Sequence, residues 1–174
     1  VAIPASVADV FTRIAAAVEV SWRLPDRSDV PALFKDLSWG CCAWDARRLP
    51  ELEQSRHSWV ENAFSDPDDE YDRVWRGKLP LFDVPNGDMV AVDLARGDAA
   101  PVVYLSHDDG AAHGRVLGYS FSDFLDRWAL RGCVGPEEWL MTPFLRPDEP
   151  YLDPIGRAAQ SWRSWFGLDV LAPC

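Results

Sequence analysis

The stretch from residue 79 to residue 130 constrains the fold most strongly, because three strand patterns are followed there by one well-marked helix. The first two strands are joined by Pro85-Asn86-Gly87-Asp88, in which Asn and Gly tolerate the positive φ angles of a tight hairpin. The second strand, at residues 89–94, alternates its apolar side chains with period two, which predicts a sheet that is covered on one side only. The third, at residues 101–107, is rich in β-branched and aromatic residues and is expected to lie inside the sheet.

Two capping residues mark the start of the helix that follows these strands. Ser120 is placed to accept hydrogen bonds from the free N–H groups of the first turn, and Asp123 occupies the capping-box position with a charge that complements the helix dipole. Apolar residues at helical spacing form one face, namely Phe121, Phe124, Leu125 and Trp128. The sequence therefore predicts that this helix packs flat on the sheet.

Further elements are expected on both sides of this centre. Ser6 is placed to cap a helix whose apolar stripe extends to Val18. Residues 40–44 suggest a short strand, and residues 50–64 suggest a helix with one apolar face. The proline-rich tail is expected to be extended except for a helix at residues 153–166, which either docks on the core or contacts another copy of the chain.

Several of these segments together resemble a known family. In chain order they are Pro80-Leu81-Phe82, Asn86-Gly87-Asp88, Val90-Ala91-Val92-Asp93-Leu94, Pro101-Val102-Val103-Tyr104-Leu105-Ser106-His107 and Ser120-Phe121-Ser122-Asp123-Phe124-Leu125. Their order and spacing resemble the core of the SUKH superfamily, which contains the fungal Smi/Knr cell-wall regulators and many bacterial immunity proteins that neutralise polymorphic toxins. The resemblance covers residues 41–130, whereas the N-terminal third departs from the family pattern.

The resemblance implies an α+β fold in which helices pack on one face of a mainly antiparallel sheet. It also implies a protein that binds other proteins without catalysing a reaction. A chain of 174 residues is long enough for one domain with a substantial core. We therefore expect a single SUKH-like domain over residues 1–174, with a core at residues 41–130, a divergent N-terminal helix region and a C-terminal extension with a helix.

The charge balance limits the class of partner. The chain has 28 acidic and 17 basic residues and a formal net charge of −11, which disfavours nucleic acid and anionic membranes and favours basic proteins. No apolar run approaches the length of a membrane span. The four cysteines, Cys41, Cys42, Cys133 and Cys174, show neither zinc spacing nor a disulfide framework. We expect a cytoplasmic protein with reduced thiols.

One candidate binding segment is strongly acidic. It contains Asp66, Asp68, Asp69, Glu70 and Asp72. A calcium loop of the EF-hand type counted from Asp66 needs Gly and Glu where the chain has Tyr71 and Gly77, so calcium binding is not predicted. The segment is either a solvated loop or a contact surface for a basic partner.

A second candidate binding segment comprises His107, Asp108 and Asp109. Together with His113 these residues invite a metal or general-base interpretation, but a further ligand of suitable spacing is missing, and a structural turn or a partner contact is favoured. Carboxylates in a hairpin turn, as at Asp88, and on a wet strand face need no such role. No nucleophile–base pair and no glycine-rich phosphate loop is evident, so catalytic residues, metal ligands and cofactors are all predicted to be absent.

These observations favour a non-catalytic immunity protein that binds a basic toxin domain, such as a nuclease, in a stoichiometric complex. Two alternatives stay open. The first is a regulatory scaffold of the cell-wall-signalling kind. The second is a small metal-dependent hydrolase built on His107, Asp108 and His113.

Overall fold

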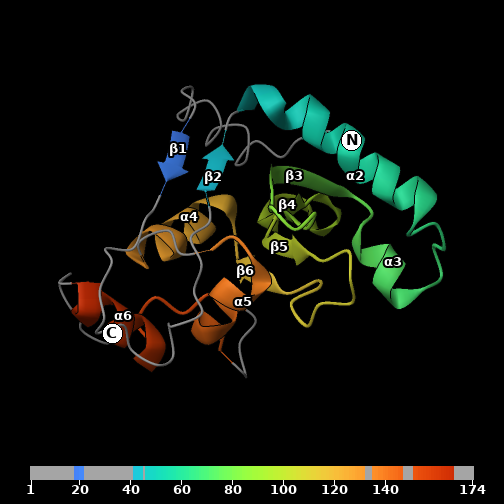
Figure 1. Cartoon of the computed structure of the whole chain (residues 1–174). Helices are drawn as coiled ribbons and strands as arrows, with labels where there is room; N and C mark the ends of the chain where they lie inside the picture. Colours follow the sequence, from blue (N-terminus) through green and yellow to red (C-terminus); the bar gives the residue numbers. More distant parts are fainter. Residues whose placement is uncertain (1–17, 22–40, 45, 132–134, 147–150, 167–174) are drawn as a thin grey trace.

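The computed structural model describes residues 18–21, 41–44, 46–131, 135–146 and 151–166. A four-stranded antiparallel sheet lies at its centre (Figure 1), and its strands follow one another in chain order. They are β3 (Lys78–Asp83), β4 (Met89–Asp93), β5 (Val102–Leu105) and β6 (Val116–Gly118). The three predicted strands are confirmed, and β5 is an interior strand as expected. Strand β6 was not predicted, because three residues between turns carry too short a pattern.

The β3–β4 hairpin closes through the predicted turn. The Val84 N–H donates to the Asp88 carbonyl at 2.8 Å, and the Gly87 N–H donates to the Val84 carbonyl at 2.9 Å. Gly87 has φ of +101°, a conformation that side-chain-bearing residues rarely adopt. Pro80 is accommodated because β3 is an edge strand, where a missing N–H donor costs little.

Both faces of the sheet are covered, which corrects the expectation of helices on one face only. One face packs Val90, Val92, Val102 and Tyr104 into a core with residues of the later helices. The opposite face packs Met89, Ala91, Val103 and Leu105 against Val60, Phe64 and Trp75. Every residue of β4 is buried, so the predicted wet face of this strand does not exist.

Five α-helices are found in the part of the chain that the structure describes, and α6 lies further from the sheet than α4 and α5 do (Figure 1). They are α2 (Leu49–Asn62), α3 (Glu70–Val74), α4 (Phe121–Leu130), α5 (Glu138–Met141) and α6 (Arg157–Phe166). Short 3₁₀ turns lie at Ala46–Arg48 (η2), Leu94–Ala99 (η3) and Thr142–Phe144 (η4). A separate antiparallel pair consists of β1 (Val18–Ser21) and β2 (Cys41–Trp44).

Helix α4 forms as its local signals predict. Ser120 Oγ accepts a hydrogen bond from the Asp123 N–H at 3.1 Å, and Asp123 Oδ2 accepts one from the Tyr119 N–H at 2.7 Å. Phe124 and Trp128 are buried against the sheet, and the Phe82 ring of β3 lies 5.7 Å from the Trp128 ring. The predicted apolar face is therefore the face that packs on the sheet.

The ends of the chain agree with the sequence only in part. The strand at residues 40–44 is confirmed as β2 and the helix at residues 50–64 as α2. The helix expected after Ser6 is wrong at Val18, which begins β1, and its earlier residues lie outside the described part of the chain.

In the tail, α6 is confirmed and docks on the core. Trp162 is 1% exposed, and its ring packs edge-on to that of Phe144 with centroids 6.4 Å apart. Helix α5 and the turn η4 were not predicted and replace part of the expected extended tail, because Leu140 and Met141 enter the same core. The α+β class with a mainly antiparallel sheet is confirmed. Every helix in the described ranges is too short or too polar to cross a bilayer.

Candidate functional site

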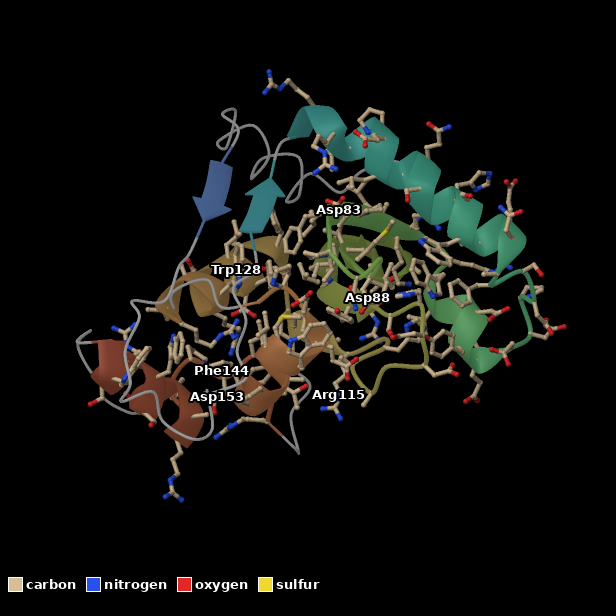
Figure 2. The ribbon with its side chains drawn as sticks, viewed as in Figure 1. Asp83, Asp88, Arg115, Trp128, Phe144 and Asp153 are labelled. Carbon is tan, nitrogen blue, oxygen red and sulfur yellow. The ribbon has the colours of Figure 1, made fainter. Side chains whose placement is uncertain are left out.

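A buried carboxylate, Asp88, organises one end of the sheet. Asp88 is 1% exposed, and Figure 2 shows it in the interior, between the sheet and α3 in this view. Its Oδ2 accepts hydrogen bonds from the Tyr104 hydroxyl at 2.7 Å and from Asn86 Nδ2 at 2.8 Å. Its Oδ1 accepts from the His107 N–H at 2.9 Å and from His107 Nδ1–H at 2.7 Å. We call these four residues the Asp88 network.

The network keeps Asp88 ionised. Burial alone would raise its pKa, but the hydrogen bonds from Tyr104, His107 and Asn86 outweigh burial and hold the pKa of Asp88 below its ordinary value. Burial and the hydrogen bond to Asp88 raise the pKa of Tyr104, so its hydroxyl remains a donor. Asp88 lies in the predicted turn, but the sequence does not indicate that its carboxylate is buried and hydrogen-bonded by distant residues.

Asp93, expected on a wet strand face, is also buried. Its Oδ1 lies 3.0 Å from Lys78 Nζ, and the Asp93 carboxylate also accepts a hydrogen bond from the Ala95 N–H. A buried charge is tolerated only when it is paired in this way. Asp93 thus serves the fold at the end of β4, next to Lys78 of the edge strand β3, and is not part of the Asp88 network.

Tyr71 of α3 joins the two acidic segments that the sequence singles out. Its hydroxyl donates to the Ser106 carbonyl at 2.6 Å and accepts from the Asp109 N–H at 3.0 Å. Its ring stacks on His113 with centroids 3.7 Å apart. Residues 66–72 and 107–109 are therefore neighbours in space, and we call them together the acidic surface.

His113 is a structural residue of this junction. Its Nδ1 accepts from the Ser106 N–H at 3.0 Å, and its Nε2–H donates to the Tyr71 carbonyl at 3.0 Å. Burial lowers the pKa of His113, which agrees with a neutral ring that both accepts and donates. Both ring nitrogens are thus engaged, so the structure does not place His113 with His107 and Asp108 as the hydrolase alternative requires.

The five carboxylates of residues 66–72 divide into two groups. Asp69 Oδ1 accepts from two N–H groups of the first turn and caps α3. Asp66 Oδ1 accepts from the Asp68 N–H at 2.9 Å, and Asp72 Oδ2 accepts from the Asp66 N–H at 3.0 Å. Within the described ranges, no hydrogen bond or ion pair is found on the carboxylates of Asp68 and Glu70, which are both exposed. These two charges face solvent without supporting the turn.

In the second acidic segment, too, one carboxylate supports the loop and another does not. Asp108 is exposed, and its Oδ1 accepts the Ser106 hydroxyl at 2.7 Å. Asp109 is exposed at φ of +60° and uses its backbone N–H, not its carboxylate, to contact Tyr71. His107 is less exposed than either, with 24% of its side chain accessible. All eight candidate residues from the sequence thus lie on or beside the acidic surface.

Glu138 of α5 supports the far side of the 106–113 loop. Its Oε1 accepts from the Ala112 N–H at 3.0 Å, and its own N–H donates to the Tyr104 hydroxyl at 3.1 Å. Burial, with the charges of Asp88 and Asp108, raises the pKa of Glu138. No sequence pattern indicates this contact, because the sequence does not predict α5 itself.

Three residues of this region have the ligand types of a metal site. Single ligand atoms of Asp88, His107 and Asp108 lie within 4.8 Å of one another. Both oxygens of Asp88 already accept hydrogen bonds from the protein, and one of them is bonded to His107 itself. A metal would have to displace these bonds to gain Asp88 as a ligand, and zinc prefers three or four protein ligands.

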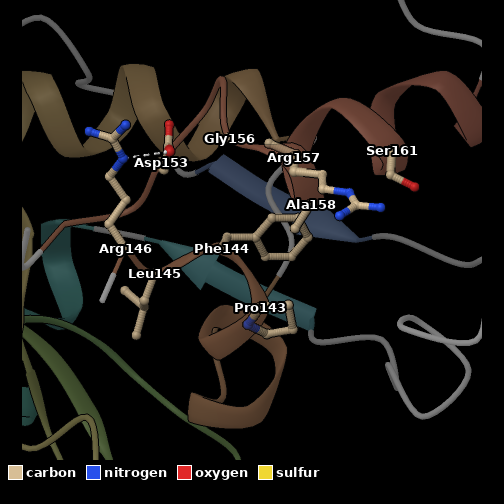
Figure 3. Close-up of a pocket in the computed structure, with 10 residues that line it drawn as sticks. Pro143, Phe144, Leu145, Arg146, Asp153, Gly156, Arg157, Ala158 and Ser161 are labelled. Atoms are coloured by element: carbon tan, nitrogen blue, oxygen red, sulfur yellow. Dashed lines mark ion pairs between the residues drawn. The ribbon is translucent and has the colours of Figure 1, made fainter. Parts of the chain in front are cut away.

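A hollow of about 700 Å³ lies apart from this cluster, between η4 and the start of α6 (Figure 3). Arg146 Nε lies 3.0 Å from Asp153 Oδ2 in its wall. Asp153 Oδ1 also accepts from the Ile155 N–H at 3.0 Å, two residues before α6 begins. These charged groups connect the tail to the core and therefore have a structural role. We place the candidate site at the acidic surface and not in this hollow.

No family model matches the chain, and neither a curated protein nor a solved structure matches it. The SUKH resemblance therefore rests on the motifs of the sequence alone.

Proposed function

We propose that this protein is a non-catalytic, cytoplasmic binding domain that neutralises a basic toxin domain by forming a stoichiometric complex. The observation that carries the proposal is the junction at Tyr71, which brings residues 66–72 and 107–109 into one acidic surface. The whole chain carries a net charge of −11, so its overall electrostatic potential has the same sign as that of the acidic surface. A surface of one sign accelerates encounter with partners of the opposite sign.

The arrangement of Ser106 and His107 supports a binding role over a catalytic one. A serine nucleophile must be accessible to its substrate as well as to a base. Ser106 is fully buried, with its hydroxyl bonded to Asp108, and His107 is oriented by Asp88 and not by Ser106. The side chains of Ser106 and His107 are therefore already hydrogen-bonded within the protein.

The test compares two double variants that remove the same charge. Asp68→Asn with Glu70→Gln neutralises two carboxylates of the acidic surface that support no turn. Asp98→Asn with Asp126→Asn neutralises two exposed carboxylates elsewhere and is the matched control. Association with a toxin domain encoded beside the gene is measured at low and high salt. We expect the first variant to associate roughly three- to tenfold more slowly at low salt, with dissociation little changed.

Equal association rates and equal salt dependence for the two variants would refute the acidic surface as the interface. The exposed Trp139, with 47% of its surface accessible, would then be the next position to test. If no toxin partner binds, the immunity proposal is refuted and the scaffold function takes its place.

A further inference from the structure

We propose that His107, Asp108 and Trp59 form a binding site for one arginine side chain of the partner, an inference that rests on the proposed function. The observations that carry it are the fixed orientation of the His107 ring, its acceptor nitrogen without a partner among the described residues, and the adjacent indole. Each is independent of the overall negative charge.

The His107 ring is held in one position by its surroundings. Its centroid lies 5.2 Å from that of the Trp59 ring. Gly87 lies against it as well, since a Cβ added there would be 3.4 Å from His107 Cε1. The Asp88 hydrogen bond at 2.7 Å fixes the remaining rotation. An orientation fixed before binding lowers the entropic cost of recognition.

The same hydrogen bond determines which nitrogen accepts. Asp88 is buried and ionised, so its carboxylate accepts a hydrogen bond from the protonated Nδ1 of His107. In the neutral ring, Nε2 then carries the lone pair. Within the described ranges, His107 Nε2 has no hydrogen-bond partner, and the ring is partly exposed. The partly exposed His107 ring therefore offers an acceptor, and one of its nitrogens lies within 4.8 Å of an Asp108 oxygen.

These acceptors match a guanidinium better than a metal ion. With Asp88 saturated by protein donors, His107 and Asp108 supply two ligands, which is fewer than zinc needs. A guanidinium instead presents a planar fork of donors and stacks on aromatic faces. Trp59 supplies such a ring next to His107, and its indole is only partly buried. Lysine, which lacks the fork, is a poorer match.

The experiment uses two fluorescent peptides of equal charge, one with three arginines and one with three lysines separated by Gly-Ser. Binding to the full chain is measured by fluorescence anisotropy at low salt. We expect wild type to prefer the arginine peptide about fivefold. The preference should fall to about one in Trp59→Leu and in His107→Asn, while binding of the lysine peptide stays the same. Asn at position 107 can still donate to Asp88 from the place of Nδ1 but has no acceptor in the place of Nε2.

Asp108→Asn is the second variant if His107→Asn does not fold, because position 108 is exposed and the retained oxygen can still accept from Ser106. Equal binding of both peptides, reduced by Asp68→Asn with Glu70→Gln, would refute the arginine site and leave the acidic surface intact. If neither peptide binds, both proposals are refuted. One Zn²⁺ per chain that is lost in His107→Asn would reassign the site to a metal.

Discussion

Asp88→Asn tests the Asp88 network most directly. The carboxylate accepts four hydrogen bonds, two at each oxygen. An asparagine keeps one of these oxygens and turns an NH₂ group toward the two donors at the other position. Hydrogen bonds to a charged group are worth about 1.5–3 kcal/mol each, and a buried donor without an acceptor carries its own penalty. We expect the free energy of unfolding to fall by about 3–5 kcal/mol.

The assay is urea denaturation of wild type, Asp88→Asn and the exposed control Asp98→Asn, with the control within about 0.5 kcal/mol of wild type. The pH dependence gives a second readout. The folded-state pKa of Asp88 lies below its ordinary value of 3.8, so its stabilisation is complete above pH 3.8 and is lost as the pH falls through the folded-state pKa. The difference between wild type and Asp88→Asn should therefore shrink below pH 3.8. A difference under about 1 kcal/mol at pH 7 would refute the central role of Asp88.

Three further predictions follow from the described contacts. Trp128→Ala should lower the free energy of unfolding by about 3–5 kcal/mol by leaving a cavity against Phe82, whereas Leu130→Ala, at a position 37% exposed, should cost under about 1 kcal/mol in the same denaturation assay. The pKa of His113 is lowered by burial, so wild type should lose stability as the pH falls below 6.5, by up to about 1.4 kcal/mol per pH unit. This loss should be absent in His113→Asn, and equal pH slopes for the two proteins would contradict the prediction. The purified protein should hold no stoichiometric Zn²⁺, Mn²⁺ or Ca²⁺, and elemental analysis showing one metal per chain that depends on His107 would overturn this expectation.

The sequence predicted best those elements whose signals are local. The turn at residues 85–88 and the cap at Ser120 each complete their hydrogen bonds within a few residues, so their chemistry is visible in the chain. The β-branched and aromatic residues of β4 and β5 mark both segments as strands, and the two pair antiparallel from Met89–Leu105 to Val92–Val102. These features account for the correct prediction of β3, β4, β5 and α4.

The errors have a common physical cause, which is pairing between distant residues. Asp93 looks like a residue on a wet face, but Lys78 neutralises it in the interior. A buried ion pair and a solvated face give the same alternation of polar and apolar residues. The covering of the second face likewise depends on Trp75, which follows a helix too short to be recognised from periodicity.

The candidate site was predicted as two separate segments. Their adjacency depends on Tyr71, whose contacts with Ser106 and Asp109 span 35 and 38 residues of sequence. No pattern in a single sequence pairs a tyrosine with a distant backbone carbonyl. Asp88 is recognised from the sequence only as a turn residue, since its donors Tyr104 and His107 lie in and just after β5, 16 and 19 residues further along the chain.

The Asp88 network serves the fold and the proposed interface through the same bonds. Asp88 holds the hairpin turn to the end of β5, and its bond to His107 also fixes the ring that would meet the partner. A variant at Asp88 would therefore lose stability and binding together, and it cannot separate the two roles. Asp68 and Glu70 have no bond to Asp88 and are both exposed, so loss of binding without loss of folding is expected at these two positions. A binding defect confined to Asp88 variants, with none at these two positions, would mean that the network acts on the fold alone.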